Sequence, residues 1–443
     1  MKKSVFLLSV VTAMTLSAAS SIASAFAEGK AYGNIKYYFI ETNKDDGAGT
    51  TSSAHANTAG GQLGYETAMF YGVKLGATFM TTNPFALPNV VDTSVIGKDN
   101  GVRGGDAKQG FSVLGEAYMA YRRDFFSLWY GRKKVNTPLI HTKEVRLLPS
   151  TVQGAMADIS LADVHIDAGY LDRFKQRTSD DFINIVEHAL GGDTEAVTGH
   201  TSGYVIPVSV VYDNKSLQLQ AYDYYSADFM NSVYLGAKYK FKTAGFGFCL
   251  GAQYINQKSV GNADDNLGKS GSITGGKTLN ANAFGFKAAM KQNETSLYAA
   301  YTNVLRSEND HDSLVLPWDG TPLFTNMITS NDLFQSLYGK AFKADSAYIG
   351  GTQGIKLALS QGFDFTGFKG FKATVAWAQY SNSRTGYDKD QQDVNAVLAY
   401  GAGPFSLALK GIWVSNNTGM SKDGTVSQLD KLTQYRVIAN YKF

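Results

Sequence analysis

The last ten residues of the chain alternate between apolar and polar side chains with a period of two. The odd positions from Tyr435 to Phe443 are apolar or aromatic, and the even positions from Gln434 to Lys442 are mostly polar. Successive side chains of a β-strand point to opposite faces, so this segment predicts a strand with two unlike faces. Such a strand fits the wall of a membrane barrel, with the apolar face in lipid and the polar face in the lumen. An edge strand of a soluble β-sandwich is the alternative.

The same alternation recurs through the chain, and it is clearest in residues 217–222, 233–241, 246–254, 296–301 and 406–413. Short turns separate some of these segments, at residues 242–245, 291–294 and 401–404, whereas residues 256–278 form a long polar connection. Short turns on one side and long loops on the other are typical of outer-membrane barrels, with the turns periplasmic and the loops extracellular. We therefore expect an all-β protein, one transmembrane antiparallel barrel of about 18 strands with 16 as the alternative, and a water-filled lumen.

The first 27 residues have the composition of a secretory signal. Lys2 and Lys3 precede an apolar stretch, and Ala25-Phe26-Ala27 follows as a small-x-small cleavage site. This order predicts a signal peptide over residues 1–27, which is cleaved, and a mature barrel over residues 28–443. An uncleaved anchor helix is the alternative, but the apolar stretch is shorter than the roughly 20 residues that span a bilayer.

The charge of the chain argues against a nucleic-acid-binding protein, and its cysteine content excludes a fold stabilised by intrachain disulfides. Without Lys2 and Lys3 the 41 basic residues become 39, against 38 acidic ones, so the mature chain is almost neutral. A nucleic-acid-binding protein normally shows a strong basic excess. Cys249 is the single cysteine, which rules out an intrachain disulfide. A closed barrel supplies stability to an exported chain through its complete hydrogen-bond ladder instead.

Nine basic residues share the polar face of the predicted strands. Because a charge facing lipid would cost up to about 4 kcal/mol near the midplane, we assign them to the lumen. As a set they predict a track of positive charge that attracts anionic groups. The alternative is that they wet the wall or extend their amines to water at strand ends. The track comprises Lys36, Lys74, Lys238, Lys240, Lys287, Lys372, Lys410, Arg436 and Lys442.

Residues 131–154 lack strand alternation and contain two prolines, which indicates a loop. Leu139, Ile140, Leu147 and Leu148 give this loop apolar anchors. A loop with such anchors packs against other parts of the protein, and inside a large barrel it would narrow the channel. A surface loop packed on neighbouring loops is the alternative. The candidate constriction residues in this loop are Arg132, Lys133, His141, Lys143 and Arg146.

Several motifs in this chain resemble the OprD family of outer-membrane porins. They are Tyr130-Gly131-Arg132, Thr137-Pro138, Arg146-Leu147-Leu148-Pro149 and Pro317-Trp318-Asp319-Gly320. The chain is also similar to the major outer-membrane porins of Campylobacter-like bacteria. The resemblance implies an 18-stranded barrel with inward-folded constriction loops near residues 131–154 and 313–345. It implies that Arg146 is an eyelet cation, with Arg132 and Lys143 next, and that Asp319 supplies an acid. It also implies substrates such as basic amino acids and small carboxylates.

The leading hypothesis is a passive porin with moderate selectivity for small hydrophilic solutes: ions, amino acids or small carboxylates. A surface structural or adhesive protein anchored by the barrel is the alternative, and a barrel-embedded enzyme is a weaker third, since no catalytic motif is present. We expect no cofactor, although Asp264-Asp265 and Asp310-His311-Asp312 are acidic loops of the kind that bind Ca²⁺. The expected partners are outer-membrane lipid and lipopolysaccharide, the barrel assembly machinery and, in a homotrimer, further copies of the chain.

Overall fold

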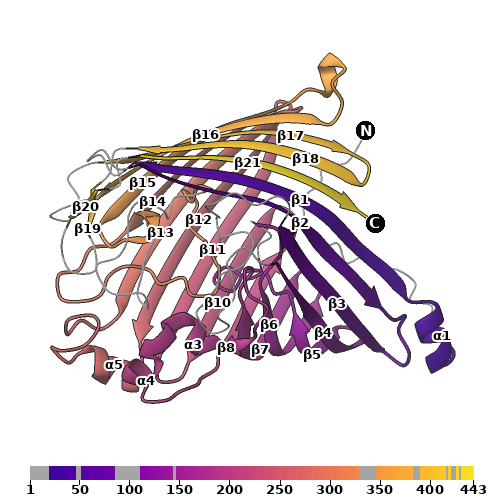
Figure 1. Ribbon diagram of the computed structural model, residues 1–443, viewed down its shortest axis with the longest axis horizontal. Helices are drawn as coiled ribbons and strands as arrows, with labels where there is room; N and C mark the ends of the chain where they lie inside the picture. Colours follow the sequence, from indigo (N-terminus) through magenta and orange to yellow (C-terminus); the bar gives the residue numbers. More distant parts are fainter. Residues whose placement is uncertain are drawn as a thin grey trace.

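The computed structural model describes residues 19–45, 51–84, 110–142, 146–328, 346–382, 390–415, 418–420, 426–428 and 431–443. Within them, 18 antiparallel strands wind into one closed barrel, shown in Figure 1. This confirms the predicted all-β barrel and the larger of the two expected strand numbers. Its wall consists of β1 (Lys30–Asp45), β2 (Thr51–Glu66), β3 (Val73–Pro84), β4 (Phe111–Arg123), β5 (Phe126–Lys133), β6 (Thr151–Leu161), β7 (Val164–Lys175), β9 (Ile206–Asp213), β10 (Leu217–Ser226), β11 (Met230–Thr243), β12 (Phe246–Ser259), β13 (Asn280–Gln292), β14 (Thr295–Val304), β15 (Thr352–Gly362), β16 (Phe371–Asn382), β17 (Gln391–Ala402), β18 (Phe405–Ser415) and β21 (Lys431–Lys442).

The first and last wall strands close the barrel by pairing with each other. The pairing runs from Asn34 opposite Lys442 to Asp45 opposite Lys431. On the inner face the Asn34 side-chain amide donates a 2.5 Å hydrogen bond to the side-chain oxygen Oδ1 of Asn440. Closure leaves the wall without a free edge, so every strand can satisfy its backbone groups within the sheet, as a lipid environment requires.

The two faces of the wall differ in the way that the alternation predicts. Large apolar side chains remain exposed on the outer face, among them Leu235, Leu250, Phe286, Leu357 and Leu409. Neighbours of opposite parity point inward and are half-buried or buried. A soluble sandwich would bury its apolar face between two sheets. Here that face surrounds the molecule, which fits lipid as its solvent and argues against the sandwich alternative.

Connections at the two ends of the barrel differ in length. At the end that holds the C-terminus, several turns have only two residues, such as 124–125, 244–245 and 293–294. Asp124, Ala244 and Asn293 adopt positive φ there, which lets the strands reverse tightly. The opposite end carries longer connections with α3 (Ile185–Leu190), η1 (Gly191–Asp193), α4 (Thr194–Thr198), α5 (Asn262–Leu267), η2 (Ser346–Tyr348) and the short strands β8 (Ile183–Asn184), β19 (Thr418–Met420) and β20 (Val426–Gln428).

Two further short helices lie near the short-turn end: α1 (Ile22–Ala27) and η3 (Asp364–Thr366). In α1, the Ala25 carbonyl accepts a hydrogen bond from the Ala68 amide of the β2–β3 turn. No helix among the described residues is long and apolar enough to cross a membrane.

An apolar core lies inside the barrel, where parts of four long connections pack on the inner face of the wall. Trp318 is completely buried and donates from its indole nitrogen to the Ile185 carbonyl at 3.1 Å. Leu139 and Leu314, from two different connections, belong to the same cluster as Tyr224 of the wall. The lumen is therefore partly filled, and the remaining space is set by how these connections fold inward.

Candidate functional site

The connection between β5 and β6 lies against the inner wall of the barrel. Leu147 and Leu148 are buried in a cluster with Tyr38 and Ile40 of β1 and Met80 of β3. These wall residues all have inward parity. The apolar anchors of the sequence thus hold residues 146–150 on the lumen side of the wall, which leaves Arg146 inside the barrel.

A second connection, between β14 and β15, packs directly on the first. The His141 amide donates to the Trp318 carbonyl at 3.0 Å, and the Gly320 amide donates to the Leu139 carbonyl at 3.2 Å. A Cβ at Gly320 would lie only 2.4 Å from the Leu139 Cα, so this close approach requires glycine. The two loops therefore form one body inside the barrel.

Asp319 joins three inward segments through its carboxylate. One oxygen accepts a hydrogen bond from the Ser150 hydroxyl, and the other lies 2.7 Å from the Arg177 guanidinium. The Arg177 amide in turn donates to the Ser150 hydroxyl at 3.0 Å. Nearby, the Lys175 amine donates to the backbone carbonyls of Pro149 and Gln176, each at 3.1 Å. These bonds fix the segments on either side of Arg146 and Asp319.

The charge state of Asp319 follows from its neighbours. Burial by itself raises the pKa of this carboxyl, but the Arg177 guanidinium and the Ser150 hydroxyl outweigh it, so the pKa lies below its ordinary value. The carboxylate therefore stays ionised at neutral pH and keeps its hydrogen bonds to both partners.

This lowered pKa predicts how the loops respond to acid. Their stabilisation by Asp319 is present above the ordinary Asp pKa of about 3.9 and is lost only when pH falls through the lower folded value. We expect single-channel conductance and protease resistance of the loops to stay unchanged as pH falls from neutral toward that ordinary range. If the loops loosen at pH values above this range, an ionised Asp319 carboxylate is not what holds the three segments together.

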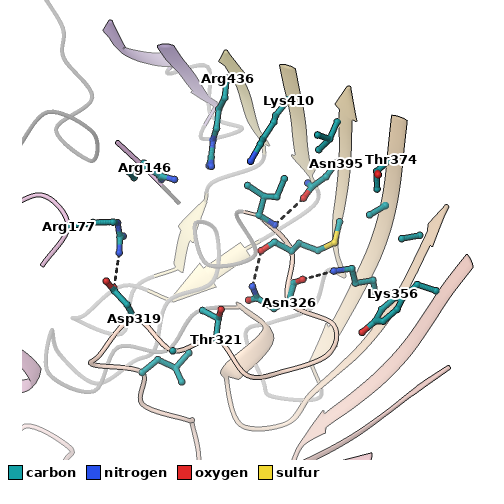
Figure 2. A pocket seen from close by; sticks show the side chains of 18 residues that line it. Arg146, Arg177, Asp319, Thr321, Asn326, Lys356, Thr374, Asn395, Lys410 and Arg436 are labelled. Atoms are coloured by element: carbon teal, nitrogen blue, oxygen red, sulfur yellow. Dashed lines mark hydrogen bonds and ion pairs between the residues drawn. The ribbon is translucent and has the colours of Figure 1, made fainter. Parts of the chain in front are cut away.

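A cavity of about 680 Å³ lies between these loops and the wall formed by β14 to β18 and β21. Figure 2 shows Lys410 and Arg436 extending from adjacent strands on the same side of the cavity as Arg146. Lys410 and Arg436 are direct cross-strand partners, so they share the inner face. Arg177 and Asp319 lie on one side of this view and Lys356 lies on the other, with Asn326 between them. Five cationic side chains and one carboxylate thus line the cavity among the described residues.

Apolar atoms cover another part of the cavity lining. Leu316, Met327 and Ile328 come from the β14–β15 connection, and Val397 comes from the inner face of β17. The Ile328 amide is held by the Asn395 side chain at 3.0 Å, and the Lys356 amine donates to the Asn326 carbonyl at 2.7 Å. The cavity lining therefore combines cationic side chains with an apolar surface.

Of the residues singled out by the sequence, Arg146, Asp319, Lys410 and Arg436 line this cavity. Lys36 of β1 lies beside it, with its amine 3.4 Å from the Arg146 carbonyl. His141 is half-buried on the adjoining loop. Lys143 lies outside the described residues.

Arg132, Lys133 and Lys74 lie on the wall away from this cavity. Arg132 donates to the Gln153 side chain at 3.1 Å and lies over the Phe182 ring at 4.3 Å. The Lys133 amine lies over the Tyr118 ring at 4.5 Å, and Lys74 pairs with Glu66 at 2.8 Å. All three cations thus interact with side chains of the neighbouring strands β2, β4 and β6 or of the connection after β7.

The remaining five residues of the track lie toward the short-turn end. Lys238 donates to the Gln218 side chain at 2.9 Å, and the Lys287 amine lies over the Phe324 ring at 4.3 Å. Lys240 is half-buried opposite Cys249. Lys372 and Lys442 have inward parity but are exposed at the rim.

Two cations of the cavity escaped the sequence analysis. Lys356 lies on β15 between Ile355 and Leu357, which are half-exposed on the outer face. That alternation is present in the sequence and could have identified Lys356 as a lumen residue. Arg177 follows β7 in an irregular segment, and the sequence contains no periodic signal for its position.

The comparisons with known proteins agree with this architecture. A model of the family described as "outer membrane porin, OprD family" matches residues 28–357. The chain belongs to the OprD family of outer-membrane porins. No curated protein matches the chain by sequence.

Solved porins share the fold of this OprD-family chain at low sequence identity. Pseudomonas aeruginosa OccK9 (OpdG) superposes with a TM-score of 0.74 and 15% identity, over 95% of this chain and 99% of OccK9. P. aeruginosa OccK2 (OpdF) in complex with glucuronate gives 0.72 and 12%, over 95% and 99%. P. aeruginosa OpdK with vanillate gives 0.71 and 14%, over 94% and 99%.

The family membership settles the class of function. The chain is a porin of the bacterial outer membrane, a passive channel for small solutes and not an enzyme. The alternative of a barrel that only anchors adhesive loops is not supported. The described residues contain no group of three or more His, Cys, Asp or Glu side chains placed to hold a metal ion.

Proposed function

We propose that this porin favours small anionic solutes, carboxylates above all. The observation that carries the proposal is the charge of the cavity: Arg146, Arg177, Lys356, Lys410 and Arg436 line it together with a single carboxylate, Asp319. The mature chain as a whole is almost neutral, so this excess is local. Charge of one sign in a narrow lumen raises the local concentration of oppositely charged solutes.

The chemistry of the cavity suits a carboxylate with a carbon skeleton. Guanidinium groups such as Arg146 and Arg436 bind carboxylates through paired N–H donors. Leu316, Met327 and Val397 offer apolar contact to the rest of the solute. A solute with one charged and one apolar end would therefore contact both parts of the lining at once.

Lys238, Lys240 and Lys287 continue the positive charge from the cavity toward the short-turn end. We propose that they pass the anion on toward the periplasm. Solved relatives support an anionic substrate class, since OpdK was crystallised with vanillate and OccK2 with glucuronate, both of which are carboxylates.

We also propose that the loops near residues 131–154 and 313–345, of which residues 143–145 and 329–345 lie outside the described residues, form the constriction of the channel. The packing of Leu147 on the inner wall supports this, as do the hydrogen bonds from His141 to Trp318 and from Gly320 to Leu139. For export, residues 1–27 are proposed to be removed, and the barrel assembly machinery is proposed to recognise β21 with its exposed terminal Phe443. Assembly as a homotrimer remains a prediction.

The proposal is tested by solutes of equal size and different charge. Benzoate, benzyl alcohol and benzylammonium differ little in volume, so flux differences between them report charge selection. In proteoliposomes we expect benzoate to enter faster than benzylammonium by about tenfold, the lower end of electrostatic steering. Equal fluxes, or a faster flux of the cation, would refute the preference for anions while leaving the porin assignment intact.

A further inference from the structure

The turn between β15 and β16 differs from every other connection at the short-turn end. It contains eight residues, 363–370, whereas the others have two to six. It carries Phe365 and Phe368, whose side chains are 72% and 65% exposed. Figure 1 shows it as the orange projection that stands clear of the barrel wall above β17.

The turn is held in a defined conformation. The Gly370 amide donates to the Asp364 carboxylate at 2.7 Å, and the Asp364 amide donates to the Glu294 carboxylate at 3.0 Å. Gly370 has a φ of +80°, and a Cβ there would lie 2.2 Å from the Gly401 carbonyl oxygen. The Gly401 amide at the end of β17 donates to the Gly370 carbonyl at 3.0 Å, so hydrogen bonds connect the turn both to the β13–β14 turn and to β17.

A row of aromatic rings connects this turn with the lipid-facing wall. Phe368 contacts Phe371 at 6.2 Å between ring centroids, Phe371 contacts Tyr400 at 4.6 Å, and Tyr400 contacts Phe405 at 6.4 Å. Phe371, Tyr400 and Phe405 share the outward parity of Val375, Leu398 and Leu409, which are exposed on the wall. The rings of the turn therefore extend a surface that already faces lipid.

We propose that residues 363–370 anchor the barrel in the phospholipid interface of the periplasmic leaflet. Phe365 and Phe368 insert among the acyl chains near the headgroups, where aromatic rings of membrane proteins gather. Lys369, which follows Phe368 and is also exposed, meets the lipid phosphates. Continuity with the lipid-facing ring row argues for lipid over a second copy of the chain or a periplasmic protein.

The proposal is tested with site-specific fluorophores in proteoliposomes of phosphatidylethanolamine and phosphatidylglycerol. Cys249→Ser removes the native thiol, and Phe365→Cys and Phe368→Cys then accept an NBD label one at a time. Lys215→Cys, in the polar turn between β9 and β10 at the same end, is the matched control. We expect phospholipid-borne doxyl groups to quench the labels at 365 and 368 several-fold more strongly than the label at 215, and aqueous iodide to show the reverse order.

Two outcomes would overturn the anchor. Quenching by doxyl lipid that is equal at all three positions would place the turn in water. Shielding of positions 365 and 368 from both quenchers, with dipolar broadening between nitroxide labels on neighbouring copies, would place the turn in a protein interface. Phe365 has no ring contact within the described residues, so Phe365→Cys provides a test even if Phe368→Cys disturbs the ring row.

Discussion

Replacing Arg146, Lys410 and Arg436 together by glutamine is expected to abolish the anion preference of the channel. The three side chains line one cavity, and Lys410 and Arg436 are direct cross-strand partners on its wall. Their removal leaves Arg177, Lys356 and Asp319 as the charged groups of the described lining. We expect the anion-to-cation permeability ratio to fall by about tenfold, in line with electrostatic enrichment in charged clefts. Reversal potentials in a planar bilayer under a KCl gradient measure this ratio.

Lys215→Gln provides the matched control, because it removes a positive charge from a turn outside the lumen. It should leave the reversal potential at the wild-type value. Arg146→Ala alone should already change conductance or ion selectivity. If the triple variant keeps the wild-type reversal potential, neither the cavity nor the position of Arg146 governs selectivity.

Asp319→Asn is expected to widen the channel. The carboxylate binds Arg177 and Ser150 from two other segments, and the Asp319 and Arg177 side chains are only 16% and 23% exposed. Removing one partner of a largely buried ion pair costs on the order of 3–5 kcal/mol, because the remaining charge loses its compensation. The loops should then leave the wall part of the time. We expect higher and noisier single-channel conductance, and faster proteolysis within residues 134–150.

The chain offers a control for this variant within the same connection. Arg306 and Glu308 form an ion pair at 3.2 Å, but the Glu308 side chain is 81% exposed. An exposed pair contributes at most about 1 kcal/mol, so Glu308→Gln should leave conductance unchanged. Equal conductance traces for Asp319→Asn and Glu308→Gln would show that the Asp319 contacts do not hold the loops in the lumen.

The sequence predicted the barrel well because a strand records its two environments directly in the chain. Alternation around Leu235 or Leu409 assigns each side chain to a face without knowledge of any neighbour. The turns at 244–245 and 293–294 lie within the predicted turns 242–245 and 291–294, where Gly245 and Asn293 are residues that tolerate positive φ. The same alternation assigns Lys356 to the lumen, because the apolar residues Ile355 and Leu357 flank it in the sequence.

The contacts inside the lumen could not be predicted in this way. Arg177 and Asp319 lie 142 positions apart and meet only because two loops fold inward. The resemblance suggested Asp319 as an acid of the eyelet, but its carboxylate is occupied by Ser150 and Arg177. Likewise the alternation around Lys74 predicted that its side chain faces the lumen, but not that it forms an ion pair with Glu66. The local alternation of side chains specifies which face of a strand a residue occupies, whereas the partner of a charged side chain depends on how distant segments pack.

The seam between β1 and β21 has a consequence for the order of folding. Its two members include Asn34 and Asn440, which are 406 positions apart in the chain. Every other wall pair joins strands far closer in sequence, so the loop entropy of forming this one is the largest. The sheet can therefore curl from its hairpins first, with β1 paired only to β2 and β21 paired only to β18, and it closes into a barrel only when these two strands meet. Until that moment β1 and β21 each present an open row of backbone donors and acceptors, which makes the nascent barrel most vulnerable to wrong pairing at its last step.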